Sequence, residues 1–287
     1  MTRRGLVWLW LLPVVTGAAL VVAALRYLPG PPSAQGMNSR PAATTTSPPA
    51  TSPSLPPLLL RPAEVRVRTS GFWSWALLDR RTGEVAGSTN LADRNTTASM
   101  IKVWLAADYL RRAAAAGDRP GDARLDLLST MIRDSDNEAA WTMWRELGEA
   151  ATIQRLIDVC ALTDSRPGSR WSLTELSARD AVRMGACVAD GRAAGPQWTN
   201  WLLDEMRQVR GEGDFGIRKA LPASVAPQTA IKNGWILREE DGNWHLNCLG
   251  IGDGWVLAVL LRYPGNLGFA HGRSICKSIT QQLLSAP

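Results

Sequence analysis

The sequence predicts an α+β fold with two lobes, one a mixed antiparallel sheet with flanking helices and the other entirely helical. Three observations support this prediction: strand-like runs open the folded part, helical periodicity fills its middle, and strand-like runs followed by one helix close it. If the early and late strands share one sheet, the helices between them form a second lobe. A cleft between the lobes is then the expected place for a ligand.

The elements follow in this order. Residues 72–80 and 81–90 predict two strands around a turn at Arg81-Thr82-Gly83. Apolar residues at helical spacing then predict helices over residues 99–117, 137–148, 149–162, 172–191 and 196–209. Strand-like runs return over residues 229–237, 243–252 and 255–264, and a helix over residues 271–285 ends the chain.

A long apolar run near the N-terminus predicts a membrane segment. Residues 6–25 carry no charge and follow Arg3 and Arg4, and such a run is long enough to span a bilayer as a helix. We expect an uncleaved anchor over residues 1–27, with a cleaved signal peptide as the alternative. Because the two arginines favour a cytoplasmic N-terminus, both alternatives predict an extracytoplasmic protein, anchored in the membrane or secreted.

Residues 28–57 predict a linker. They contain nine of the chain's 18 prolines and little that could form a core. We expect a disordered tether that holds a folded domain away from the membrane. That domain is expected over residues 58–287, with its helical lobe from about residue 99 to residue 210.

The net charge of +6 does not indicate a nucleic-acid-binding protein. Arg3, Arg4, Arg26 and Arg40 are the only charged residues before Arg61, so +4 of this charge lies outside the folded part. The remaining +2 is typical of a solvated surface. We expect a monomeric chain with no nucleic-acid partner.

Two serines stand three positions before a lysine: Ser99 before Lys102, and Ser274 before Lys277. A serine and a lysine at this spacing share one face of a helix and can form a nucleophile with its own base. Chance spacing is the alternative, and the presence of two copies shows how easily it arises. Only four of the 32 basic residues are lysines, which favours a chemical role for those that remain.

Ser99 stands at the start of a predicted helix, where we expect Thr96 or Thr97 to act as the cap. The positive end of the helix dipole would favour a developing oxyanion there. A partly desolvated Lys102 would have a lowered pKa and could take the proton of the serine.

Only the first pair is followed by two further motifs, Ser135-Asp136-Asn137 and Lys232-Asn233-Gly234. The three together resemble the penicillin-recognising serine enzymes, most closely the class A β-lactamases, whose motifs are S-x-x-K, S-D-N and K-T-G. The resemblance runs over nearly all of the chain from about Trp73. It implies a two-lobed β-lactamase-like fold and a substrate that is a β-lactam or a D-Ala-D-Ala-like peptide of the cell wall.

The resemblance also implies a catalytic role for four residues. Ser99 would attack the amide to form an acyl-enzyme, with Lys102 as base or proton relay. Ser135 would pass a proton to the leaving nitrogen, and Lys232 would supply positive charge toward a substrate carboxylate. Asn137 would hold the substrate amide and steady Lys102.

Three residues of the third motif are expected to bind substrate: Asn233, Gly234 and Trp235. The backbone N–H groups of Ser99 and Trp235 would form the oxyanion hole. Asn233 departs from the family pattern, which has a hydroxyl residue there, and a bulkier amide predicts a shifted substrate preference.

The E-x-x-L-N motif, whose glutamate deacylates class A β-lactamases, is missing. The corresponding segment, residues 162–180, offers only Asp164, Glu175 and Asp180, and we expect Glu175 on the exposed face of the following helix. Slow deacylation is therefore predicted. This leaves two alternatives to a β-lactamase: a D,D-peptidase or penicillin-binding protein with slow deacylation, and a non-catalytic cell-wall binding protein.

The four cysteines permit three disulfide pairings. Proximity in the expected fold favours Cys160 with Cys187 and Cys248 with Cys276. No C-x-x-C spacing occurs, so we expect neither a metal site nor a cofactor. The two histidines, His245 and His271, are expected to be structural.

Overall fold

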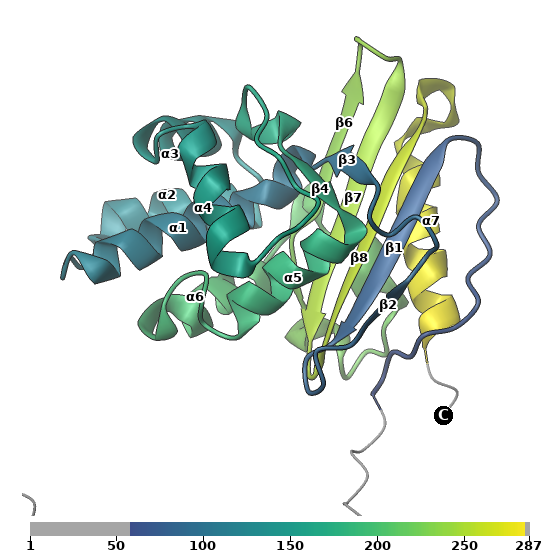
Figure 1. Ribbon diagram of the computed structural model, residues 1–287, viewed down its shortest axis with the longest axis horizontal. Helices are drawn as coiled ribbons and strands as arrows, with labels where there is room; N and C mark the ends of the chain where they lie inside the picture. The colour runs from purple at the N-terminus through teal and green to yellow at the C-terminus, as the bar shows by residue number, and fades with distance from the viewer. Residues whose placement is uncertain (1–57, 285–287) are drawn as a thin grey trace, which may run out of the picture. The chain divides into compact units, whose positions relative to one another are not determined.

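A computed structural model describes residues 58–284 of the chain (Figure 1). The predicted anchor and linker lie outside the described residues. Within residues 58–284, no helix is both long enough and apolar enough to cross a membrane.

A six-stranded antiparallel sheet lies at the centre of the fold. The strand order is β2-β1-β8-β7-β5, and β6 also pairs with β7. The strands are β1 (Phe72–Asp79), β2 (Val85–Gly87), β5 (Ala230–Ile231), β6 (Gly234–Arg238), β7 (Asn243–Gly252) and β8 (Trp255–Pro264). The first and last strands of the chain thus share one sheet, as the sequence predicts.

Both faces of this sheet are buried. Strand β8 shows why, because its side chains alternate between two hydrophobic cores. Val256, Ala258 and Leu260 face the core shared with the helical lobe. Leu257, Val259 and Leu261 face a second core, under the C-terminal helix. A strand buried on both faces reads as a continuous apolar run, which is how this segment reads in the sequence.

Six helices form the lobe on one side of the sheet, and α7 covers the other side (Figure 1). The helices are α1 (Lys102–Ala115), α2 (Asp122–Arg133), α3 (Asn137–Glu146), α4 (Ala150–Cys160), α5 (Ala178–Ala189), α6 (Pro196–Arg207) and α7 (Gly268–Leu283). Helix α5 packs directly on β1 and β8. The predicted α+β, two-lobed fold class is confirmed.

Short elements lie between the main strands and helices. Strands β3 (Arg94–Thr96) and β4 (Glu175–Ser177) form a separate antiparallel pair. The 3₁₀ turns are η1 (Ala98–Ile101), η2 (Trp171–Leu173), η3 (Gly211–Gly213), η4 (Gly216–Ala220), η5 (Ala226–Gln228) and η6 (Gly265–Leu267). Both η1 and η2 lie where the sequence predicts regular helix.

Three predictions about the helices are corrected. Helix α2 was not predicted, although its 12 residues bury Leu128, Met131 and Ile132. The helix expected from residue 172 begins only at Ala178, because η2 and β4 occupy the residues before it. The helix expected from residue 99 begins as the 3₁₀ turn η1.

Each core contains one disulfide, and the favoured pairing is confirmed. Cys160 of α4 is bonded to Cys187 of α5, with their Cα atoms 5.5 Å apart. Cys248 of β7 is bonded to Cys276 of α7, with Cα atoms 6.5 Å apart. The first bond joins two helices of the lobe, and the second joins the sheet to the helix behind it.

Candidate active site

Ser99 lies on η1, directly after β3, and lines a cleft between the lobes. Ala98 before it has a φ of 45°, in the left-handed region that residues with a side chain rarely adopt. Such strain collects at functional sites. The expected threonine cap is not formed: Thr97 makes no side-chain capping bond, and its buried hydroxyl has no partner.

Lys102 is the first residue of α1 and is fully buried. Its Nζ donates hydrogen bonds to the Ser135 carbonyl oxygen at 2.5 Å and to Asn137 Oδ1 at 2.8 Å. Burial lowers the pKa of Lys102 to about 7, against the opposing charge of Asp136. A lysine with this pKa is neutral in about half of the molecules at neutral pH, so it can accept a proton.

The second motif lies on the loop between α2 and α3. Ser135 has a φ of 61°, and its Oγ accepts hydrogen bonds from Lys232 Nζ at 2.9 Å and from Lys102 Nζ at 3.4 Å. Asp136 caps α3 by accepting a bond from the Ala139 N–H at 2.7 Å, so it braces the turn. The Ser135 hydroxyl thus connects two buried lysines.

Lys232 lies between β5 and β6 and is fully buried. Burial lowers the pKa of Lys232 well below its usual value, and the neighbouring charge of Lys102 lowers it further, while Asp134 opposes the shift. Two buried amines with one hydroxyl between them can pass a proton in either direction.

Gly234 allows β6 to pass directly beside η1. A Cβ at this position would lie 2.3 Å from the Thr97 carbonyl oxygen and 2.7 Å from the Ser99 nitrogen. A side chain would therefore push the strand away from the serine. The close approach puts the backbone of β6, and with it Trp235, against the turn that carries Ser99.

Asn233 does not line the cleft. Its side-chain amide donates to the carbonyl oxygens of Gly213 and Phe215, both at 2.9 Å, and its Oδ1 is buried without a partner. The structure thus directs this amide toward η3 and the segment after it.

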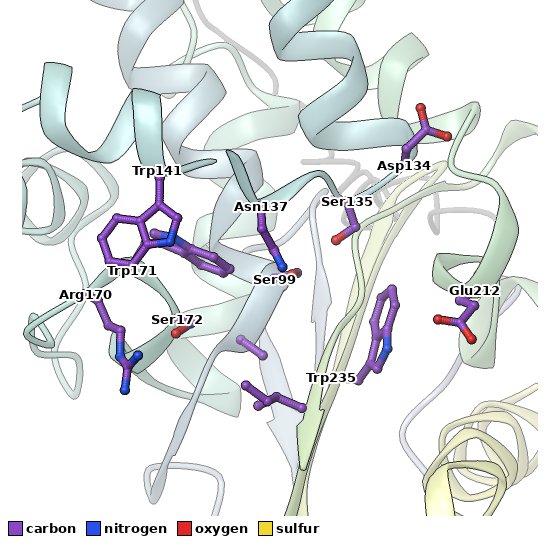
Figure 2. Close-up of a pocket in the computed structure, with 12 residues that line it drawn as sticks. Ser99, Asp134, Ser135, Asn137, Trp141, Arg170, Trp171, Ser172, Glu212 and Trp235 are labelled. Carbon is purple, nitrogen blue, oxygen red and sulfur yellow. The ribbon is translucent and has the colours of Figure 1, made fainter. Parts of the chain in front are cut away.

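The cleft has a volume of about 410 Å³. Figure 2 shows Trp141, Trp171 and Arg170 on one side of it and Trp235 and Glu212 on the other, with the motif residues between them. The complete lining is Ala98, Ser99, Asp134, Ser135, Asn137, Trp141, Arg170, Trp171, Ser172, Glu212, Trp235 and Ile236.

Sequence reasoning missed most of the aromatic and charged lining, because no motif marks it. Trp171 is the most informative of these residues. The Lys102 Nζ lies 4.7 Å from the centroid of its ring, a cation–π geometry when the amine is charged. Trp141 meets the same ring edge-on, with centroids 6.4 Å apart. The only feature of the sequence that could have indicated a role for Trp171 is its position within residues 162–180, the segment in which a deacylating carboxylate was expected.

The three carboxylates of that segment are bound elsewhere and do not line the cleft. Asp180 is fully buried at the start of α5 and accepts bonds from the backbone of the preceding loop. Asp164 is paired with Arg179. Glu175 lies on β4, not on the following helix as expected, and pairs with Arg166. The loop offers Arg170, Trp171 and Ser172 to the cleft instead.

The second serine–lysine pair lies on α7, behind the sheet. Ser274 and Lys277 are exposed and do not line the cleft, and the Ser274 hydroxyl donates to the His271 carbonyl oxygen at 2.7 Å. In the part of the chain that the structure describes, no group of three His, Cys, Asp or Glu residues could hold a metal ion.

The chain matches known β-lactamases in two comparisons. The model of the Beta-lactamase enzyme family matches residues 120–240, which include the second and third motifs. A search of curated protein sequences finds no match.

Solved β-lactamase structures share the fold. A β-lactamase from Chitinophaga pinensis DSM 2588 is similar at 16% identity and a TM-score of 0.62, over 75% of this chain and 93% of that one. A β-lactamase from Burkholderia vietnamiensis has 18% identity and a TM-score of 0.63, over 75% and 90%. A class A β-lactamase from Mycobacterium abscessus has 16% identity and a TM-score of 0.58, over 74% and 92%.

These findings confirm the resemblance seen in the motifs: the chain has the fold of the class A serine β-lactamases, and residues 120–240 match the β-lactamase enzyme family.

Proposed function

We propose that this β-lactamase-like chain is a serine hydrolase that forms an acyl-enzyme at Ser99 with a β-lactam or a D-Ala-D-Ala-like amide. One observation carries the proposal: two buried lysines and the Ser135 hydroxyl meet beside a cleft that Ser99 lines, and burial brings the pKa of Lys102 to about 7. Buried amines without a carboxylate partner are costly, so their retention favours a chemical role.

The acylation step follows from these contacts. Neutral Lys102 would take the proton of the Ser99 hydroxyl as Oγ attacks the amide carbonyl. The backbone N–H groups of Ser99 and Trp235 would receive the oxyanion. Ser135 would then deliver a proton to the leaving nitrogen, and Lys102 would return to this hydroxyl the proton that it took from Ser99.

In the described structure the Ser99 hydroxyl makes no hydrogen bond to Lys102, whose amine bonds to Ser135 and Asn137 instead. Catalytic hydrogen bonds are often absent before substrate binds. We expect the amine to turn toward Ser99 when an amide enters the cleft, since the Asn137 side chain can then bond to the substrate.

The predicted slow deacylation favours the second candidate, a penicillin-binding protein or D,D-peptidase. The wall formed by Arg170, Trp171 and Ser172 offers no carboxylate to activate water. The acidic lining residues, Asp134 and Glu212, come from other elements, and Asp134 is paired with Arg210. Hydrolysis would then depend on Lys102 or Ser135 acting a second time.

We also propose that the domain works outside the cytoplasm, attached through the predicted anchor or secreted, as a monomer. The two disulfides support this location, because such bonds persist in oxidising compartments. Cell fractionation and gel filtration of the full chain test these points. Recovery of the protein in the cytoplasm with reduced cysteines would contradict them.

The main test is the intact mass of the full chain after incubation with a penicillin. The proposal predicts a gain of one penicillin mass for the parent and for Ser274→Ala, and none for Ser99→Ala. A parent that gains no mass must instead turn over penicillin rapidly. If it shows neither an adduct nor turnover but still binds penicillin, the non-catalytic wall-binding alternative is correct.

A further inference from the structure

A chain of polar side chains runs from the exposed Asp241, in the turn after β6, through the buried His245 and Arg238 to the wall of the cleft. Asp241 Oδ2 lies 2.9 Å from His245 Nε2, and His245 Nδ1 lies 2.7 Å from Thr96 Oγ1. Arg238 Nε donates to the same Thr96 oxygen at 3.3 Å, and its Nη2 donates to the Ser172 carbonyl oxygen at 2.7 Å. We call Asp241, His245, Thr96 and Arg238 the Asp241 relay.

A neutral His245 gives the relay one direction of hydrogen bonding. The Asp241 carboxylate can only accept, so Nε2 of His245 carries the proton. Nδ1 then accepts from the Thr96 hydroxyl, whose oxygen in turn accepts from Arg238. Burial lowers the pKa of His245, and the charges of Arg238 and Arg262 lower it further, while Asp241 opposes the shift. These groups therefore keep the neutral form that the relay requires.

The far end of the relay fixes the element that carries Trp171. Ser172 and Trp171 both belong to η2, and Arg238 is bonded to this turn by its buried guanidinium. The Trp171 indole nitrogen is buried without a hydrogen-bond partner, so no polar contact orients the ring itself. Its position over the Lys102 amine therefore depends on the backbone of η2 and on the edge contact with Trp141.

We propose that the Asp241 relay positions η2 so that Trp171 covers the Lys102 amine and excludes water from it. Its relevance to catalysis rests on the proposed function, in which Lys102 is the base. The four relay residues, from β3, β6, the turn after β6 and β7, would thus act as positioning residues for an amine that none of them touches. Loss of the relay should let η2 move, admit water to the amine and raise the pKa of Lys102 toward that of an exposed lysine.

Nuclear magnetic resonance of the full chain, labelled with ¹³C at the lysine ε-carbon, tests this directly because the chain has four lysines. Loss of one signal in Lys102→Met assigns the resonance. In the parent we expect Lys102 to titrate near pH 7, because burial lowers its pKa to about 7. In Thr96→Val, which keeps the shape but breaks the relay, the midpoint should rise by about one pH unit or more. Thr96→Ser keeps the hydroxyl and should restore the parent value.

Lys102 is faced by two charged residues, Asp136 and Lys232, and both are unchanged in these variants. A shift in the Lys102 midpoint therefore reports movement of Trp171 and not a change in the surrounding charge. Trp171→Leu removes the ring and should raise the midpoint at least as far as Thr96→Val. If Thr96→Val does not fold, His245→Gln breaks the relay one step further out and takes its place.

If the Lys102 midpoint in Thr96→Val equals that of the parent, the inference is overturned. It is also overturned if the midpoint shifts in Thr96→Val but not in Trp171→Leu. Acylation of the same samples by a penicillin separates this from the proposed function. If the parent is never acylated at Ser99, the role of Lys102 as base is lost, whereas the titration still decides whether the relay holds the cover in place.

Discussion

Replacing Lys102 by methionine should make the protein more stable and inactive. Burial lowers the pKa of Lys102 from 10.5 to about 7. One pKa unit corresponds to about 1.4 kcal/mol, so holding the ammonium in the fold costs about 5 kcal/mol below pH 7. Methionine removes this cost but leaves the Ser135 carbonyl oxygen without its donor, which costs about 1–3 kcal/mol, whereas the exposed Asn137 amide can bond to water in the cleft. We expect Lys102→Met to raise the free energy of unfolding near pH 7 by about 2–4 kcal/mol.

The pH dependence of this difference is the sharper test. The pKa of Lys102 is lower in the folded than in the unfolded state, so the unfolded state binds more protons between about pH 7 and pH 10.5. The free energy of unfolding of the parent should therefore rise over this range, whereas Lys102→Met lacks the effect. The advantage of the variant should shrink by about 2 kcal/mol from pH 7 to pH 9.

Urea unfolding followed by circular dichroism, with the disulfides intact, measures both quantities. Lys277→Met is the matched control, because Lys277 is exposed on α7 and should show neither effect. A Lys102→Met protein that is less stable than the parent, by the same amount at pH 7 and pH 9, would refute the reasoning.

Three further outcomes are expected. The rate of acylation by a penicillin should rise about tenfold between about pH 6 and pH 8, as the neutral form of Lys102 becomes dominant, and a flat profile would argue against this base. Ser172→Glu places a carboxylate on the wall formed by Arg170, Trp171 and Ser172 and should shorten the lifetime of the acyl adduct, whereas Ser172→Gln should not. Equal lifetimes in the two variants would show that a missing carboxylate does not limit deacylation. Gly234→Ala should slow acylation at least about tenfold, since its Cβ would lie 2.3 Å from the Thr97 carbonyl oxygen, and a parent-like rate would show that β6 need not lie so close to Ser99.

The large elements of the fold were predictable because their hydrophobic patterns are strong. The continuous apolar run of β8 and the strands before it gave the central sheet, and helical spacing gave most of the lobe. Helix α2 was missed because only three of its 12 residues are buried, so its periodicity is weak. Residues 172–177 were expected to be helical, but pairing between β3 and β4 prevailed over local propensity.

The motif residues could be selected from the sequence because their order along the chain is specific. Of the four predicted catalytic residues, Ser99 and Ser135 line the cleft, and Lys102 and Lys232 are buried beside it with their amines bonded to the Ser135 hydroxyl; their catalytic roles stay a prediction. The cover over Lys102 could not be named, because it depends on the path of a loop and on contacts between residues far apart in sequence. Trp171 lies 69 positions after Lys102, and no local pattern connects the two.

The most direct test of the account is to locate the acyl group after the full chain reacts with a penicillin, by fragmenting its peptides in a mass spectrometer. The account predicts that the penicilloyl group is attached to Ser99, and that Ser99→Ala and Lys102→Met leave every peptide unmodified at pH 7. Attachment to Ser135 or Ser274, or a modified Ser99 at the parent rate in Lys102→Met, would contradict it.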